Sequence, residues 1–258
     1  MFERLATEKR AALITYITAG DPTPARTPAL VAALERGGAD LIELGVPFSD
    51  PIADGPVIQR ASDRALKAGA SVKHVLEIAR QIREKSEIPI LLFSYLNPLL
   101  RYGFETLAHD AAAAGIDGVL LIDLSVEEAS RLVPALRSAG LDTVFLASPT
   151  STPERMKLVA TYSSGFVYLV SRTGVTGEQQ SLSNAVVPLI AAMRSYTELP
   201  LAVGFGISTP DQARQVAALA DGVVVGSAVV RVVEQAGDDV ESKLEAYAAS
   251  LAAALNKP

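Results

Sequence analysis

Short apolar runs recur eight times along this chain, and each ends in or beside Gly, Pro, Asp or Ser. Runs of about four to eight such residues are typical of strands that are buried on both faces of a parallel sheet. Amphipathic helical patterns lie between the runs, for example over residues 71–87 and 239–255. The predicted strands are residues 12–20, 40–46, 88–95, 118–123, 142–148, 166–171, 199–205 and 221–227.

Eight strands that alternate with helices predict an α/β protein with the (β/α)8 architecture of a TIM barrel. An open doubly wound sheet is the alternative. Its usual mark is a glycine-rich turn after the first strand, whereas residues 18–24 read TAGDPTP. The length of 258 residues suits one barrel, and no linker or low-complexity segment interrupts it. We therefore expect a single TIM-barrel domain over residues 1–258.

The composition favours a cytoplasmic enzyme. The formal net charge is −6 and no Lys or Arg run stands out, which disfavours a nucleic-acid partner or an anionic membrane surface. The absence of cysteine removes disulfides, thiolate metal sites and cysteine nucleophiles. The amino terminus has no basic-then-apolar signal pattern, and no apolar run approaches the roughly 18 residues that span a bilayer.

A carboxylate interrupts the second apolar run, since residues 40–56 read DLIELGVPFSDPIADGP. Side chains alternate along a strand, so the branched residues of this run should meet the helices. Glu43 is then predicted to point into the barrel, near its top. An ionised carboxylate there is costly without a partner, which leaves two interpretations: a structural hydrogen bond or ion pair, and a functional group.

The segment after this strand is the longest excursion between predicted strands. The starts of the second and third runs lie about 50 residues apart, and the excess holds a proline-rich loop and an extra helical stretch. In a TIM barrel the loops that follow the strands build the active site. Asp50 and Asp54 lie in this loop, and each alone is more often a turn or cap residue than a catalyst.

The last two strands end in glycines that favour a phosphate site. Gly206 follows the seventh run, and Gly226 and Ser227 end the eighth, where a short helix reading SAVVRVVEQ begins. Backbone N–H groups beside a helix N-terminus bind phosphate in many barrels, although glycines can also simply end strands. Residues 171–181, SRTGVTGEQQS, are either an ordinary solvated loop or a lid that closes over a phosphate ester.

Apolar side chains near the predicted strand ends suggest a pocket for an apolar, aromatic phosphate ester. The two histidines, His74 and His109, fall in helical stretches, so a histidine-based metal centre at the strand ends is not expected. The candidate pocket residues are Tyr16, Leu92, Tyr95, Leu120, Leu146, Tyr168 and Phe205.

The motif LIELGVPFSDPIADGPVIQRA closely resembles the signature of the tryptophan synthase α-subunit family. The resemblance continues through TAGDP, SYLNP, SRTGVTG, VGFGIS and VVVGSA, in order and over nearly the whole chain. It implies a retro-aldol cleavage of indole-3-glycerol phosphate to indole and glyceraldehyde 3-phosphate, without a metal or organic cofactor. It also implies a β-subunit partner that carries pyridoxal phosphate, in an α2β2 assembly whose contacts include the loop around Pro47 and Pro51.

The resemblance assigns roles residue by residue. Glu43 matches the family's general acid and base, and Asp54 matches the aspartate that holds the indole N–H. The apolar residues named above match the indole pocket or its wall. The remaining matches are Gly177, Gly206, Gly226 and Ser227 at the phosphate site, with Arg172 and Thr176 in the lid.

One departure and three rivals remain. Many family members read PDLP after the fourth strand, whereas residues 122–125 read IDLS, which bears on the shape of the pocket there. The closest rival is a free-standing indole-3-glycerol-phosphate lyase of the same family. A non-catalytic subunit that activates β is the second, although Glu43 and Asp54 are both retained. A phosphate-sugar epimerase is the third, and it lacks the metal-binding histidines at strand ends.

Overall fold

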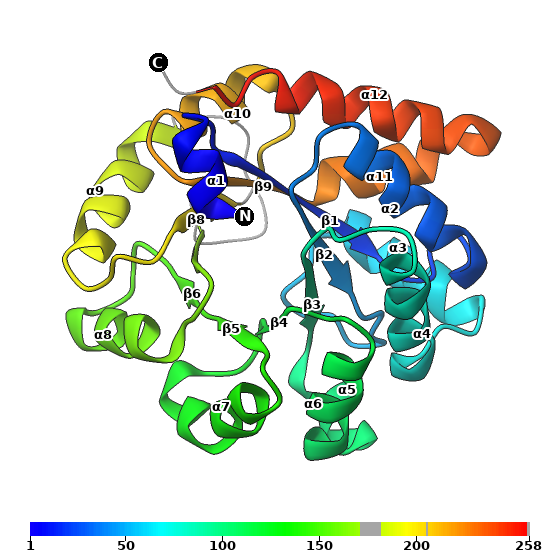
Figure 1. Ribbon diagram of the computed structural model, residues 1–258, viewed down its shortest axis with the longest axis horizontal. Coiled ribbons are helices and arrows are strands. Elements are labelled where there is room, and N and C mark those ends of the chain that lie inside the picture. Colours follow the sequence, from blue (N-terminus) through cyan, green and yellow to red (C-terminus); the bar gives the residue numbers. More distant parts are fainter. Residues whose placement is uncertain (171–181, 205, 257–258) are drawn as a thin grey trace.

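Parallel strands form a nearly closed barrel inside a ring of helices in the computed structural model of this chain (Figure 1). The structure describes residues 1–170, 182–204 and 206–256. The predicted single TIM-barrel domain is confirmed. The strands are β1 (Ala12–Thr18), β2 (Leu41–Gly45), β3 (Ile90–Ser94), β4 (Gly118–Leu121), β5 (Asp142–Val144), β6 (Leu146–Ala147), β7 (Val167–Val170), β8 (Leu201–Gly204) and β9 (Gly222–Val225).

The fifth predicted strand is divided in two. Residues 142–148 form β5 and β6 on either side of Phe145, so the described sheet has nine strands in the order β5-β4-β3-β2-β1-β9-β8-β7-β6. β5 pairs with β4, and β6 pairs with β7. Beside β5 the loop before β7 supplies side-chain partners, because Thr143 N donates to Ser164 Oγ and Phe145 N to Ser163 Oγ. The two ends of the sheet, β5 and β6, therefore meet in this one segment of the chain.

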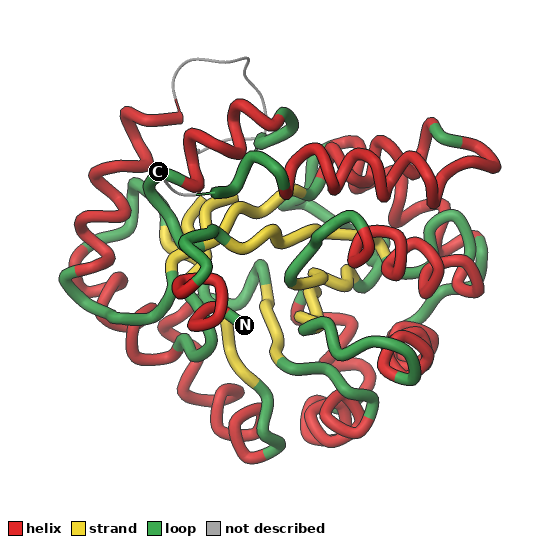
Figure 2. Tube along the Cα trace, turned by 45° about the horizontal axis from the view of Figure 1, so that its top comes forward, coloured by secondary structure: helices red, strands yellow, loops and turns green. Residues whose placement is uncertain are grey.

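Helices cover the outside of the barrel (Figure 2). Two of them, α3 and α4, lie between β2 and β3, as the long gap in the sequence predicts. In the described part of the chain no helix has the length and apolar character that crossing a bilayer requires. The α-helices are α1 (Phe2–Thr7), α2 (Thr27–Arg36), α3 (Pro56–Lys67), α4 (Val72–Arg83), α5 (Leu96–Tyr102), α6 (Phe104–Ala113), α7 (Ala129–Ser138), α8 (Pro153–Tyr162), α9 (Leu182–Arg194), α10 (Pro210–Ala217), α11 (Ser227–Gln235) and α12 (Val240–Ala252), and the 3-10 turns are η1 (Pro24–Arg26), η2 (Val126–Glu128) and η3 (Gly237–Asp239).

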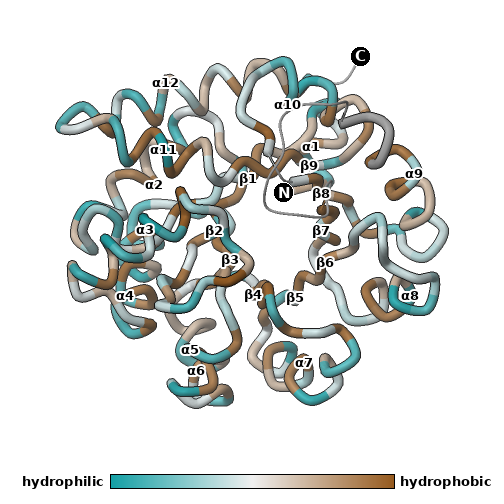
Figure 3. The backbone as a smooth tube through the Cα atoms, turned by 180° about the vertical axis from the view of Figure 1, so that it is seen from behind, coloured by the Kyte–Doolittle hydropathy of each residue, from teal (hydrophilic) through white to brown (hydrophobic). Residues whose placement is uncertain are grey.

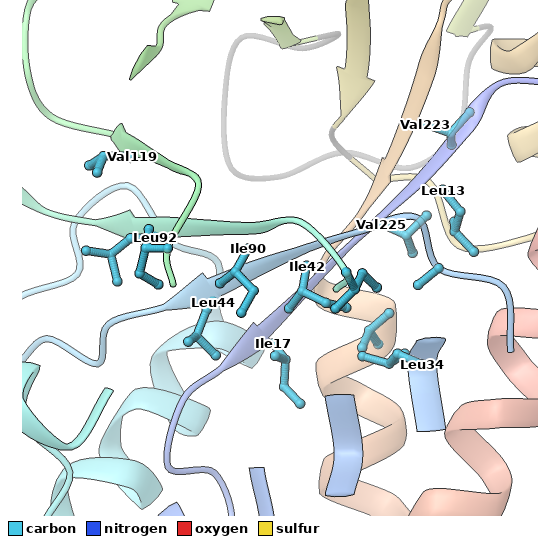
Figure 4. Packing of buried hydrophobic residues seen from close by; sticks show 14 of the residues in the cluster. Leu13, Ile17, Leu34, Ile42, Leu44, Ile90, Leu92, Val119, Val223 and Val225 are labelled. Atoms are coloured by element: carbon cyan, nitrogen blue, oxygen red, sulfur yellow. The ribbon is translucent and has the colours of Figure 1, made fainter. Parts of the chain in front are cut away.

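The larger apolar core lies between the strands and the helices (Figures 3 and 4). Alternate strand residues enter it, among them Ile42 and Leu44 of β2. Since neighbours along a strand point to opposite faces, Glu43 between them points into the barrel, as predicted.

A second, smaller core fills the barrel at the amino ends of the strands. Ile14, Leu41, Leu91 and Leu120 meet there, together with Leu5 of α1, which lies across this end. The phenyl rings of Phe2 and Phe166 lie 5.8 Å apart at the same end. This inner core lies beneath the loops at the carboxyl ends of the strands, which surround a cavity above it.

Aspartates placed before three strands clamp the amino end of the barrel. Asp40, before β2, accepts a hydrogen bond from Leu13 N of β1 at 2.8 Å and two from the Arg10 guanidinium at 2.7 and 2.8 Å. Asp117, before β4, accepts hydrogen bonds from Ile90 N of β3 and from the Arg83 guanidinium. Asp221, before β9, accepts hydrogen bonds from Leu201 N of β8 and from the Arg194 guanidinium. Each aspartate therefore fixes the register of two adjacent strands and binds an arginine.

Candidate active site

A cavity of about 310 Å³ opens at the carboxyl ends of the strands. It brings together both predicted catalytic carboxylates and three of the predicted phosphate-site residues. Apolar side chains form most of the rest of its lining. The lining includes Glu43, Asp54, Gly206, Gly226 and Ser227, with Tyr16, Ile58, Phe93, Ile122, Leu146, Tyr168 and Val170.

Glu43 lies on the cavity floor in β2, opposite Tyr16 of β1 and Leu91 of β3 in the strand register. Its side chain is buried with 1% of the residue exposed, and no described residue hydrogen-bonds its Oε1 atom. This burial raises the pKa of Glu43 to about 8, because a charged carboxylate loses its hydration there. Among the described residues, no cation is paired with Glu43.

Asp54 reaches the same cavity from the loop after β2, just before α3 begins at Pro56. It is 7% exposed, and burial raises the pKa of its carboxyl group to about 6. A hydrogen bond from the Tyr95 hydroxyl opposes this increase in pKa. Asp54 is therefore ionised in most molecules at pH 7, whereas Glu43 is protonated in most.

Tyr95 supports this loop. Its hydroxyl accepts a hydrogen bond from Ala53 N at 2.9 Å, and its ring packs 5.1 Å from that of Phe48. Tyr95 thus holds the backbone beside Asp54, and it is absent from the cavity lining. The sequence predicts Tyr95 for the pocket or its wall, and in the structure it bonds to Ala53 and Asp54, two residues that line the cavity.

Two tyrosines cross the cavity because glycines on adjacent strands leave room for them. A Cβ atom on Gly45 would lie 2.2 Å from the Tyr16 hydroxyl oxygen, and one on Gly204 would lie 2.2 Å from that of Tyr168. Tyr16 also packs edge-on against Phe93, with ring centroids 5.2 Å apart. These rings give the cavity flat aromatic walls that suit a planar ligand.

The prediction that Leu92 lines the pocket is wrong. Leu92 faces the helices in the outer core, where Figure 4 shows it with Leu44 and Ile90. Its neighbour Phe93 enters the cavity instead. The register pairs Gly45 with Phe93 and Leu44 with Leu92. Phe93 therefore shares the inward face with Gly45 and Glu43, whereas Leu92 shares the outward face with Leu44.

Some of the other predicted pocket residues line the cavity, and others lie beneath it. Leu146 and Tyr168 lie on the cavity wall. Leu120 belongs to the inner core and lies beneath the lining, while Ile122, two residues further, reaches the cavity. The departure at residues 122–125 therefore begins at a lining residue. Phe205 lies outside the described residues, as do Gly177, Arg172 and Thr176.

Three of the four predicted phosphate-site residues line the cavity. Gly206 follows β8 with φ at +80°, a left-handed conformation that favours glycine. Gly226 precedes α11, and Ser227 begins that helix with its side chain exposed. The N-terminus of α11 and the Ser227 side chain thus lie at the cavity, an arrangement that binds anions.

Metal ligands are not grouped in the described residues: no three His, Cys, Asp or Glu side chains lie together in a way that would hold an ion. The two histidines lie on helices, as predicted, His74 on α4 and His109 on α6. Both are exposed on the helix surfaces.

A larger cavity, of about 710 Å³, lies at the amino ends of the strands. Its rim includes Asp117, Asp221, Arg10 and Arg194, whose charges are already engaged in the strand clamps. The reactive groups of a barrel enzyme come from the carboxyl ends of its strands, so we assign the chemistry to the smaller cavity.

Comparison with known proteins identifies the family. Residues 2–257 match the family described as tryptophan synthase alpha chain. This chain belongs to that family. The relative from Solibacter usitatus is 64% identical over 253 residues, covering 97% of this chain and 95% of the relative. The relative from Geotalea uraniireducens is 50% identical, covering 98% and 95%.

Solved structures agree with the family assignment. Tryptophan synthase from Mycobacterium tuberculosis superposes with a TM-score of 0.92 and 37% identity, covering 100% of this chain and 97% of that chain. Tryptophan synthase subunit alpha from Legionella pneumophila gives a TM-score of 0.88 and 40% identity, covering 98% and 95%. As a tryptophan synthase alpha chain, the protein is a lyase that cleaves indole-3-glycerol phosphate in tryptophan biosynthesis, and membership of this family implies a β-subunit partner.

Proposed function

We propose that Glu43 and Asp54 carry out the cleavage of indole-3-glycerol phosphate in the cavity at the carboxyl end of the barrel. The observation that carries this proposal is the pairing of two buried carboxyl groups with different proton affinities in one cavity. Such a difference assigns one group as acid and leaves the other as an anion.

Glu43 is the general acid and then the general base. Its proton goes to C3 of the indole ring, which converts the aromatic ring to a cation and weakens the bond to the glycerol chain. The resulting carboxylate takes the proton of the adjacent glycerol hydroxyl, the carbon–carbon bond breaks, and its electron pair restores the indole ring. Indole and glyceraldehyde 3-phosphate form, and Glu43 is protonated again.

Asp54 holds the indole N–H. The protonated ring carries positive charge that extends to its nitrogen, and an ionised carboxylate beside that nitrogen stabilises the charge. The position of Asp54 supports this role, since Tyr95 and the start of α3 fix its loop. Tyr16, Phe93 and Tyr168 provide the apolar walls for the ring.

The phosphate group binds Gly206, Gly226 and Ser227 through N–H groups and the serine hydroxyl. Gly177 completes this set in our proposal, and Arg172 and Thr176 belong to a lid that approaches Asp54 on closure. No metal or organic cofactor takes part in these steps. Pyridoxal phosphate belongs to the β partner.

The partner is a β subunit in an α2β2 assembly. The loop between β2 and α3 presents Ile52, whose residue surface is 85% exposed, and α5 presents Leu100, at 51%. Both belong to segments that follow strands, on the side of the barrel that holds the catalytic cavity. Exposed apolar side chains of this kind favour a protein contact, and a contact there adjoins Asp54.

Indole release by the purified chain tests the proposal. Glu43→Gln removes the transferable proton at nearly unchanged size, and we expect the rate to fall by about 10²–10⁴-fold. Asp50→Asn, in the same loop but exposed, is the matched control and should retain activity. Near-normal indole release by folded Glu43→Gln contradicts the assignment.

The same assay with and without a β subunit separates the remaining alternatives. Strong stimulation by β supports the α-subunit function. High activity that β does not change indicates a free-standing lyase. Stimulation of β by a chain that releases no indole indicates a non-catalytic subunit.

A further inference from the structure

Arg231 extends the candidate phosphate site beyond the residues that the sequence suggested. It lies four residues after Ser227 in α11, and residues at this spacing share one face of a helix. Both residues line the catalytic cavity, together with Ser208 of the loop after β8. The Arg231 side chain is exposed and so has room to move toward a ligand.

No described carboxylate pairs with the guanidinium group of Arg231. The arginines of the neighbouring helix α3 differ in this respect. Arg60 and Arg64 both bind Glu234, which lies one turn further along α11. The acidic residue of α11 is therefore already paired with two arginines, and the charge of Arg231 remains available to a ligand.

Charge balance in the cavity gives this arginine a role. Among the described lining residues, Arg231 is the one cation, while Asp54 is an anion. The N–H groups at Gly206, Gly226 and Ser227 carry only partial positive charge. A phosphate ester near neutral pH carries close to two negative charges, and the whole chain carries −6. A full positive charge beside these N–H groups therefore strengthens the binding of a dianion in this cavity.

Tyr247 lies near Arg231 and connects α12 to the loop that carries Ser208. Tyr247 of α12 donates a hydrogen bond to Ser208 O at 2.8 Å and so ties α12 to the loop after β8. Burial raises the pKa of Tyr247 to about 12, and the charge of Arg231 acts against this increase, which places the guanidinium group near the tyrosine. Arg231 therefore lines the same cavity as Ser208 and Ser227, near the tyrosine that is bonded to Ser208.

We propose that Arg231 is a specificity-determining residue that contacts the substrate phosphate and adds a full positive charge to the site formed by the glycine N–H groups. Its planar guanidinium donates two parallel hydrogen bonds to phosphate oxygens, a geometry that a single ammonium group does not reproduce. The contact makes the site prefer phosphorylated ligands over ligands of the same shape without phosphate. This inference rests on the proposed phosphate site.

Binding of glycerol 3-phosphate to the full chain tests Arg231 directly. Arg231→Gln should weaken its affinity about tenfold at low salt and raise the KM for indole-3-glycerol phosphate by a similar factor, with kcat nearly unchanged. Arg231→Lys should recover part of the loss. Salt should weaken glycerol 3-phosphate binding less in Arg231→Gln than in the wild type, because one cation no longer contributes.

Two controls isolate the contact. Arg131→Gln removes the same charge from α7, where the side chain is 78% exposed and paired with Glu128, and it should change nothing. Indole-3-propanol, which lacks phosphate, should bind wild type and Arg231→Gln equally. Unchanged glycerol 3-phosphate affinity in Arg231→Gln overturns the proposal, and so does an equal loss for both ligands.

The experiment also separates this proposal from the assignment of catalytic roles. Glu43→Gln should still bind glycerol 3-phosphate in an Arg231-dependent manner. If wild-type chain releases no indole but shows that dependence, the catalytic assignment fails and the role of Arg231 stands. If indole is released normally and Arg231→Gln changes neither KM nor affinity, only the role of Arg231 fails.

Discussion

Glu43 and Asp54 differ in proton affinity because their surroundings differ. Glu43 has a buried carboxylate oxygen without a described partner, whereas the Tyr95 hydroxyl stabilises the ionised form of Asp54. Burial raises both pKa values, to about 8 and about 6. Between these values the site holds one proton, on Glu43, which is the arrangement that the first chemical step requires.

The pH dependence of catalysis should follow from these two groups. We expect kcat/KM for indole release to be bell-shaped, falling below about pH 6 as Asp54 is protonated and above about pH 8 as Glu43 loses its proton. Initial rates from pH 5 to 9 measure the curve. Asp54→Asn should remove the acid limb from whatever activity remains. A rate that keeps rising above pH 9 is incompatible with Glu43 as the acid.

Catalytic burial of Glu43 should reduce the stability of the fold. Burial raises the pKa of Glu43 from 4.5 to about 8, so between these pH values the folded state keeps a proton that the unfolded chain loses. The contribution of this carboxyl group to the free energy of unfolding is therefore fully present below about pH 4.5 and is lost as the pH rises to about 8. Glu43→Gln should therefore gain stability relative to wild type between pH 5 and 8, by several kcal/mol at the upper end. Urea unfolding at several pH values measures this gain.

Asp54→Asn provides a comparison for that stability effect. The Asp54 pKa is raised from 3.8 to only about 6, so the gain should develop between about pH 4 and 6 and then stay constant. If the gain in Glu43→Gln does not change with pH, the carboxyl group is not desolvated as the structure indicates.

At the level of elements, the sequence predicts the positions of strands better than their faces. Each predicted strand is present because apolar runs between turn residues need two buried faces. In β2 the polar Glu43 identifies the inward face, and that prediction is confirmed. In β3 residues 90–93 are all apolar, so the pattern does not distinguish the two faces, and Phe93 enters the cavity in place of the predicted Leu92.

The sequence also does not predict which distant segments of the chain lie in contact. The division at Phe145 depends on the loop before β7, which supplies Ser163 and Ser164 as partners beside β5. Arg231 appears in the sequence only as a polar residue of a helix. Its place in the cavity follows from how α11 packs beside β1, after the strand order has brought β9 and β1 together.

The strand clamps at the amino end should stabilise the barrel measurably. Asp40→Ala leaves Leu13 N and Arg10 without their partner in a buried setting, and we expect the free energy of unfolding to fall by about 2–4 kcal/mol. Asp142→Ala is the matched control. Asp142 begins β5 at the equivalent position, is exposed, and accepts no hydrogen bond from the described residues.

The control should change stability by less than about 0.5 kcal/mol. Equal losses in the two variants would show that the aspartates act through general charge at the strand starts, and not through the bond to the adjacent strand. Chemical denaturation at one pH is sufficient for the comparison, since both substitutions remove one carboxylate.

On the scale of the whole molecule, the site is assembled from both ends of the chain. The two carboxylates come from β2 and the loop after it, whereas the phosphate residues follow β8 and β9. β1 joins these parts by pairing with β2 on one side and β9 on the other. Arg64 of α3 adds a second link, since it binds Asp21 after β1 and Glu234 of α11.

A ligand in this cavity should therefore stabilise the barrel as a unit. Glycerol 3-phosphate at about 100 times its Kd should raise the free energy of unfolding by about 2.7 kcal/mol, which a thermal shift detects. Ser227→Asp places a fixed negative charge where phosphate is expected and should abolish the shift. Ser71→Asp makes the same substitution at the N-cap of α4, away from the cavity, and should keep it. Because aspartate is well tolerated at helix starts, both variants should fold, so a normal ligand shift in Ser227→Asp would place the phosphate site elsewhere.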